Sequence, residues 1–261
     1  MDSITPARDA RVQYVLRLAD TCLILAQRLG EWCGQAPILE EDIAMTNIAL
    51  DLVGQARSLL THAGRLGVTD LGDVPLSEDQ LAFLRVERDY FNPTVVELPR
   101  GDFAFAVLRN AMVATWLRLM WESLAASSDA ELAAIAAKAV KEARYHQRHS
   151  ADWVVRLGGG TDESQRRLRE ALQTLWPYTT ELFETDETDE RAVATRLGPR
   201  WSDLRDAWTA EMSQLLAEAQ ISAPAPTPFR SMGRIGQHSE HMGSLLTQMQ
   251  YLQRSFPAGV W

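Results

Sequence analysis

Four long stretches of this sequence place apolar residues three or four positions apart, the spacing that lines one face of an α-helix. These stretches cover about residues 8–32, 38–64, 102–126 and 129–157. Alternation of apolar and polar residues at every second position, which marks a half-buried strand, is almost missing. We expect further helices at about residues 78–91, 162–185, 199–219 and 239–254. The pattern predicts an all-α fold, a four-helix bundle with additional C-terminal helices.

The chain is long enough to form one large domain. We predict a single domain over residues 1–261, with the core bundle at about 8–157 and the additional helices at about 162–254. Its residues are 46% hydrophobic, so they can fill a core without disulfides. Cys22 and Cys33 lie on one helical stretch roughly 16 Å apart, which is too far for a disulfide. A reduced, cytoplasmic setting fits these cysteines best.

The net charge of −9 argues against a nucleic-acid partner, because binding to phosphates needs clustered Lys and Arg. The sequence contains no uninterrupted apolar run of about 18 residues, and its N-terminus lacks the basic and apolar regions of a signal peptide. We therefore expect no membrane partner.

The string KEARYHQRHS, residues 141–150, places one carboxylate and two imidazoles within eight residues of one predicted helix. On a helical wheel, Glu142, His146 and His149 lie on the apolar side, while the neighbouring basic residues lie opposite. Glu142 is therefore expected to face the interior of the bundle. A carboxylate there can bind a metal or accept hydrogen bonds.

The second long helix carries a narrow polar stripe beside its apolar arc. The stripe consists of Asn47, Asp51, Gln55, Ser58 and His62. Amides, a hydroxyl and an imidazole suit buried hydrogen bonding better than a solvated face, which would carry Lys and Glu. We expect an internal polar network here and keep metal ligation as the alternative.

Inward carboxylates on two long helices are the beginning of a di-iron carboxylate site, but the rest of the pattern is missing. Such a site takes a Glu from each of two helices and Glu-x-x-His from each of the other two, because side chains three residues apart converge on one metal. Here Gly54 follows Asp51 by three residues and Tyr145 follows Glu142 by three, so neither pair supplies an imidazole. The third long helix has only Glu122, near its end. We expect this chain to bind no metal.

Several strings resemble the non-catalytic ferritin-like subunit, usually called C, of bacterial phenylacetyl-CoA epoxidase. These strings are RLGEWCGQAP, NIALDLVGQARSLL, KEARYHQRHS, HSEHMG and MQYLQRSFP. The likeness runs from about Tyr14 to Trp261, and the strings are long enough to be specific. The resemblance implies a ferritin-like fold and a role in the aerobic catabolism of phenylacetate.

In the family that this chain resembles, a catalytic subunit of the same fold holds the di-iron centre and inserts one oxygen atom of O₂ into the ring of phenylacetyl-CoA. The resemblance implies that this chain binds no cofactor, pairs with that subunit and supports it structurally. It also implies a small accessory subunit and a reductase with flavin and an iron–sulfur centre, while phenylacetyl-CoA binds mainly to the catalytic partner. The remnants of the metal site would be Asp51, Gly54, Glu142, Tyr145 and His146.

A buried carboxylate also has a structural interpretation. A buried charge without a partner costs several kcal/mol, so we expect His146, His62 or an inward-pointing arginine to contact Glu142. His146 itself is expected to be a hydrogen-bonding core histidine and not a ligand.

Two short segments are candidates for contact with other molecules. The segment ERDYFNP ends a short helix, where it could meet an acyl-CoA or a partner at the rim of the bundle or simply pack the helix end; its residues are Arg88, Asp89, Tyr90, Phe91 and Asn92. The turn around residues 233–241 could use its glycines to approach a neighbouring chain, or Ser239 could cap the last helix. The candidate interface residues of this turn are Gly236, His238, Glu240 and His241. The acidic run at residues 184–190 is expected to be a solvated loop.

Two other functions stay open. A competent di-iron or dimanganese oxidase could combine Asp20 or Glu31 with Asp51, Glu142 and His146, although Asp20 and Glu31 lie opposite the apolar arc of the first helix. A metal-free helical interaction module unrelated to oxygenation is the other alternative. For a supporting subunit, we predict that the first and second long helices form the interface, because the first offers a second, amphipathic face.

Overall fold

The computed structural model describes residues 3–67, 74–256 and 259. Over these ranges the chain is helical, and its extended pairings are two isolated β-bridges. The α-helices are α1 (Ala10–Gly30), α2 (Leu39–Leu66), α3 (Glu78–Phe83), α4 (Thr94–Glu97), α5 (Phe103–Leu124), α6 (Ala130–Gly158), α7 (Asp162–Leu175), α8 (Glu187–Ala194), α9 (Arg205–Glu218) and α10 (Glu240–Ser255). The 3-10 helices are η1 (Glu87–Asp89), η2 (Trp176–Phe183), η3 (Trp201–Leu204) and η4 (Gly233–Ile235).

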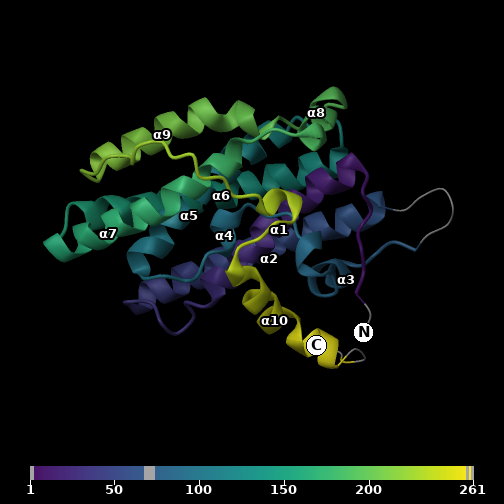
Figure 1. The fold of residues 1–261 in the computed structure, drawn as a ribbon, viewed down its shortest axis with the longest axis horizontal. Helices are drawn as coiled ribbons and strands as arrows, with labels where there is room; N and C mark the ends of the chain where they lie inside the picture. Colours follow the sequence, from purple (N-terminus) through teal and green to yellow (C-terminus); the bar gives the residue numbers. More distant parts are fainter. Residues whose placement is uncertain (1–2, 68–73, 257–258, 260–261) are drawn as a thin grey trace.

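The four long helices α1, α2, α5 and α6 form the core bundle (Figure 1). α1 packs along α2, α5 packs along α6, and contacts between α2 and α6 join the two pairs. The Tyr14 hydroxyl of α1 also donates a hydrogen bond to the sulfur of Met120 on α5, at 3.6 Å. The predicted all-α, ferritin-like bundle with additional C-terminal helices is confirmed.

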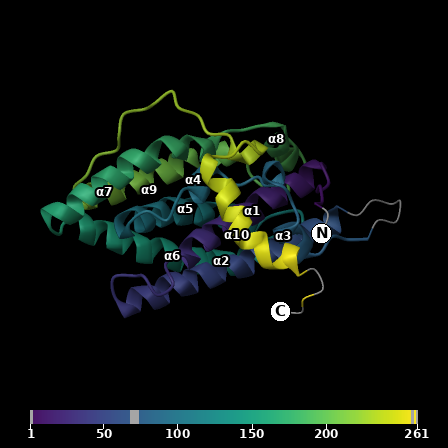
Figure 2. The same cartoon turned by 60° about the horizontal axis from the view of Figure 1, so that its bottom comes forward.

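The additional helices cover different sides of this bundle. α7 and α9 pack against α5 and α6, while α10 packs against α3, α4 and η1 (Figure 1). The segment between α9 and α10 arches over the bundle and brings α10 to its far side (Figure 2). These contacts leave α2 along the lower edge of the molecule in Figure 2.

Two predicted helices end earlier than their sequences suggested. The predicted helix at residues 78–91 stops at Phe83 and continues after a gap as η1. The helix predicted to reach residue 185 changes to 3-10 geometry at Trp176, where Pro177 follows directly. Proline has no backbone N–H and clashes with the preceding turn, so regular α-helical hydrogen bonding does not continue through it.

The predicted exposed second face of the first helix is wrong. Arg17, Asp20 and Arg28 are all buried on α1, because α4 and α8 cover the side opposite α2. α1 is therefore the central helix of the fold. It cannot provide the interface that its amphipathic sequence suggested.

The acidic run at residues 184–190 is not a solvated loop. Asp186 caps the N-terminus of α8 by accepting hydrogen bonds from the backbone N–H groups of Thr188 and Asp189. Asp189 is fully buried and accepts a 2.9 Å hydrogen bond from Arg234. Buried cations of distant segments fold this run into the molecule, and no local pattern announces them.

Among the described helices, α5 is the one long and apolar enough to cross a membrane by its length and composition. The fold buries 78% of its most apolar window. This burial is what the central helix of a packed bundle requires.

Candidate functional site

The candidate site lies where the middle of α2 faces the middle of α6. Four side-chain pairs join these helices: Glu41 with His149 at 2.9 Å, Asp51 with His146 at 3.0 Å, Gln55 with Glu142 at 2.9 Å, and His62 with Asp129 at 2.9 Å. The residue numbers rise on α2 as they fall on α6, so the two helices are antiparallel. We call these eight residues the α2–α6 polar row.

The predicted contacts of Glu142 are wrong in detail. Its carboxylate accepts a hydrogen bond from the Gln55 amide and lies 3.6 Å from the Lys138 ammonium group, one turn earlier on α6. His146 and His62 pair with other carboxylates, and no arginine is recorded at Glu142 among the described residues. The Glu142 side chain is 20% exposed, so solvent and one exposed lysine help to stabilise its charge.

His146 is 1% exposed, and its Nε2 atom donates a hydrogen bond to Asp51. Burial lowers the pKa of His146 more than the Asp51 carboxylate raises it, so the imidazole is neutral at neutral pH. A neutral ring that donates through Nε2 cannot also offer that nitrogen to a metal. The geometry of this pair is that of a hydrogen bond between helices.

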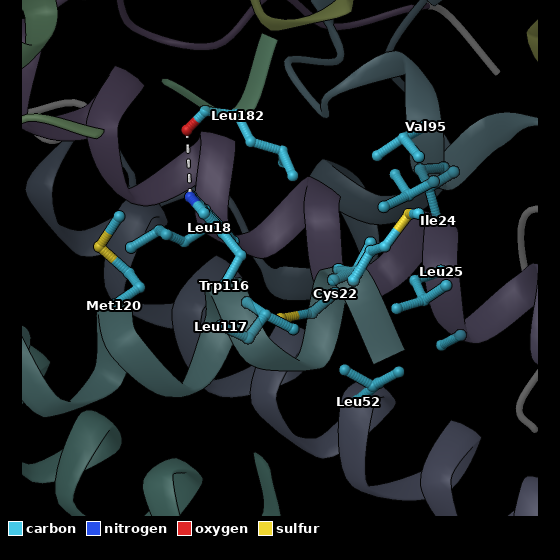
Figure 3. Close-up of a cluster of buried hydrophobic side chains, with 14 of the residues drawn as sticks. Leu18, Cys22, Ile24, Leu25, Leu52, Val95, Trp116, Leu117, Met120 and Leu182 are labelled. Carbon is cyan, nitrogen blue, oxygen red and sulfur yellow. Dashed lines mark hydrogen bonds between the residues drawn. The ribbon is translucent and has the colours of Figure 1, made fainter. Parts of the chain in front are cut away.

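Cys22 of α1 lies on the interior side of the row. Its thiol is 3.5 Å from the Gln55 amide oxygen, and Figure 3 shows it next to Leu117 of α5, in a cluster that also includes Leu52. Burial raises the pKa of this thiol far above its usual value, so it stays protonated. Apolar side chains and a neutral thiol therefore fill the interior beside the row.

The positions that lack metal-binding side chains are equally plain in the structure. A Cβ atom added at Gly54 would have no atom within 4 Å, so nothing there replaces the missing imidazole. The Tyr145 ring is 40% exposed and lies beside the rings of His146 and His149. Over the described ranges, no group of three or more His, Cys, Asp and Glu side chains is placed to hold a metal. The residues present do not fit a di-iron centre, because the carboxylates and imidazoles of the row bond to one another.

The two first-helix carboxylates considered for a metal site lie elsewhere. Asp20 is fully buried and accepts hydrogen bonds from the guanidinium of Arg85 and from the backbone N–H of Phe91. Glu31 accepts a 2.6 Å hydrogen bond from Arg28. Their partners belong to the segment after α3 and to α1, so neither carboxylate joins the α2–α6 polar row.

The segment Arg88–Asn92 is largely inside the fold. Asp89, Tyr90, Phe91 and Asn92 are each at most 8% exposed, and the Tyr90 hydroxyl donates a hydrogen bond to the backbone oxygen of Ala82. The prediction that these four residues meet an acyl-CoA or a partner at the rim is wrong, because α10 and the turn before it cover them. Arg88 alone has an exposed side chain in this segment.

The turn before α10 packs against the chain's own residues. A Cβ atom at Gly236, whose φ is +81°, would lie 2.3 Å from the backbone oxygen of Arg88. The buried His238 ring donates to Glu97 through Nδ1 at 2.6 Å and to the Tyr90 backbone oxygen through Nε2 at 3.0 Å. The close approach predicted for these glycines therefore occurs within the chain.

The rest of this turn caps the last helix. Ser239 accepts a hydrogen bond from the backbone N–H of His241 at the N-terminus of α10. Glu240 is exposed, and His241 is partly buried.

Sequence reasoning missed the buried ion pairs that fix the C-terminal part of the chain. Glu181 accepts hydrogen bonds from the backbone N–H groups of Thr94 and Arg234 and from the Ser231 hydroxyl. Arg17 pairs with Asp186 across 169 residues of sequence. The single local signal was a charged residue on the mostly apolar α1, and it could not name its partner.

Two comparisons bear on this arrangement. A family model described as "Phenylacetic acid catabolic protein" matches residues 1–261. The C subunit of the 1,2-phenylacetyl-CoA epoxidase of Escherichia coli (strain K12) is 47% identical over 252 residues. The aligned part covers 95% of this chain and 98% of that protein.

Proposed function

The chain belongs to the phenylacetic acid catabolic protein family, and we propose that it is the supporting, non-catalytic subunit of a phenylacetyl-CoA epoxidase. Its relative is a lettered subunit of that enzyme, which supports a complex with other subunits. In this proposal the partner is a catalytic subunit of the same ferritin-like fold that holds the di-iron centre and most of the phenylacetyl-CoA site. A small accessory subunit and a flavin and iron–sulfur reductase complete the cytoplasmic system.

The observation that carries the proposal is the state of the α2–α6 polar row. Where a di-iron protein directs carboxylates and imidazoles at two metal ions, these side chains bond in pairs from helix to helix. Gly54 and Tyr145 stand three residues after Asp51 and Glu142, so the Glu-x-x-His pattern is broken twice. A bundle held by such pairs keeps its shape without metal and can stabilise a partner by binding its folded state.

Metal analysis tests the non-catalytic role. The chain and the catalytic subunit are purified from iron-supplemented cells, each alone and both together. We expect about two iron atoms per catalytic subunit in the joint sample and background iron in this chain alone. About two iron atoms per molecule of the lone chain would contradict the proposal and support an independent oxidase.

Size-exclusion chromatography of the mixed chains tests the pairing. We expect one peak whose mass, from light scattering, exceeds that of either chain alone. Two separate peaks at micromolar concentration would contradict the supporting role and favour an unrelated helical module.

A further inference from the structure

α2 has two apolar faces, and the fold covers only one of them. Its inner face packs in the core through residues such as Ile48, Leu52 and Leu59, each at most 1% exposed. Its outer face carries a second row, which we call the outer seam. The outer seam consists of Leu39 (70% exposed), Ile43 (55%), Thr46, Leu50 (62%) and Val53 (40%).

The spacing of the outer seam is that of a helix-packing surface. Its residues are separated by four, three, four and three positions, the alternation that places side chains in one line along a helix facing another helix. The line is about 21 Å long at 1.5 Å per residue. Scattered exposed apolar residues are normal, but a straight row of this length marks a contact site.

Gly54 is a second, independent sign of a partner at this face. It lies in the middle of the 28-residue α2, where glycine destabilises a helix relative to alanine. An added Cβ would meet nothing within 4 Å, so no contact within this chain requires the missing side chain. Beside it, residues of α2 and α6 line a groove of about 240 Å³ that includes Ile135 and Lys138. A partner that approaches closely at this groove gives the glycine a role.

Charge along the seam defines the chemistry of the occupant. Glu40 and Asp42 lie at the Leu39 end, while Arg57 and Lys138, 73% and 76% exposed, lie beyond the Val53 end. The matching helix carries basic side chains opposite the first end and acidic side chains opposite the second. An antiparallel helix does so naturally, because acids concentrate in the first turn of helices and bases in the last.

A second copy of this chain fits less well. Parallel pairing of two α2 helices would set the acids of one against the acids of the other. Antiparallel pairing about the middle of the seam would set Arg57 against Leu39 at both ends and Thr46 against Leu50 in the centre. A different chain can satisfy both the apolar line and the charges.

We propose that the outer seam of α2, together with the groove at Gly54, binds an antiparallel amphipathic helix of the catalytic epoxidase subunit. This proposal rests on the proposed function and adds the face through which the two subunits pair. The exposed Tyr145 of α6 borders the same surface and extends it, as a stable interface of about 800 Å² per partner requires.

The test compares two substitutions in the seam with one outside it. Leu50→Glu places a charge in the seam, and Leu252→Glu makes the same change at a comparably exposed leucine of α10 (51% exposed). Both lone variants should melt within a few degrees of the wild type, because exposed substitutions perturb folding little. We expect Leu50→Glu to weaken binding of the catalytic subunit at least about 100-fold, and Leu252→Glu to leave binding unchanged.

Gly54→Ala separates folding from binding. In the lone chain it should raise the melting temperature by about 2–4 °C, because alanine favours the helix and meets no neighbour. In the complex it should weaken partner binding at least about tenfold, because the added methyl group holds the partner away. A more stable variant that binds less well is the result expected from the proposal alone.

Three outcomes would overturn it. Full binding by Leu50→Glu would place the interface elsewhere, while the pairing itself, and so the proposed function, would stand. A lone chain that is dimeric and becomes monomeric on Leu50→Glu would make a second copy the occupant. If the wild-type chains fail to pair at all, the proposed function falls together with this inference.

Discussion

Replacing Asp20 by Asn removes the charge that compensates a buried guanidinium. Arg85 is 0% exposed, and its Nη1 atom donates to Asp20 at 2.8 Å, while its second terminal nitrogen binds the other carboxylate oxygen. Burial opposes the charge of Arg85, but the adjacent Asp20 outweighs this effect and raises the pKa of the guanidinium. The Asp20→Asn variant therefore keeps a buried cation and loses its anion.

The expected cost is about 3–5 kcal/mol in the free energy of unfolding, the range found when one partner of a buried pair is removed. For a domain of this size, that cost corresponds to a decrease of about 6–20 °C in melting temperature. Urea unfolding followed by circular dichroism measures the free energy, and calorimetry measures the melting temperature. The substitution is nearly isosteric, so a packing defect cannot explain a loss of this size.

Asp9→Asn is the matched control. Asp9 also pairs with an arginine, Arg11, but at 3.4 Å and with both side chains about half exposed. Asparagine caps a helix as well as aspartate does, so this variant should lose at most about 1 kcal/mol. An Asp20→Asn variant that stays within about 1 kcal/mol of the wild type would refute the assignment of Asp20 to a buried structural ion pair.

Three further predictions concern single residues. The Glu97 carboxylate raises the pKa of His238 despite its burial, so the stability due to this pair is complete below about pH 6.5 and is lost as pH rises through the raised pKa; urea unfolding across pH should show a flatter profile for His238→Gln in that window. Burial lowers the pKa of His146, so its contribution has the opposite sign: wild-type stability should decrease as pH falls from about 6.5 to the lowered pKa, and His146→Gln should lack this decrease. Gly158→Ala would place a Cβ 2.0 Å from the backbone oxygen of Ala219, and should cost about 1–3 kcal/mol by urea unfolding; a stability equal to that of the wild type would contradict the close packing of α6 on this segment.

The long helices could be predicted from the sequence because their signal is local. Apolar residues three and four positions apart mark α1, α2, α5 and α6, and Asp9, Asp102 and Asp129 cap three of them as the chain enters the helix. The prediction was poorer where a distant contact decides the structure. α8 forms in an acidic run that looks solvated, because Arg17 and Arg234 come from remote segments to neutralise it.

The candidate site shows the same limit at the level of single side chains. Helical spacing correctly placed His146 on the buried side of α6, but it could not show which carboxylate on α2 lies opposite. The axial offset between two antiparallel helices decides that Gln55, and not His62, reaches Glu142. Spacing along one helix contains no information about that offset.

The structure also suggests why α2 is the helix on which support depends. A di-iron centre would tie all four helices of the bundle together, whereas the α2–α6 polar row ties only two of them directly. α1 joins the row through one contact, from Cys22 to Gln55, and α5 contributes apolar side chains instead of ligands. Each neutral hydrogen bond of the row adds only about 0.5–1.5 kcal/mol, so packing on both faces governs the stability of α2. Its inner face is packed in this chain, and its outer seam gains the same kind of burial when a partner helix covers it.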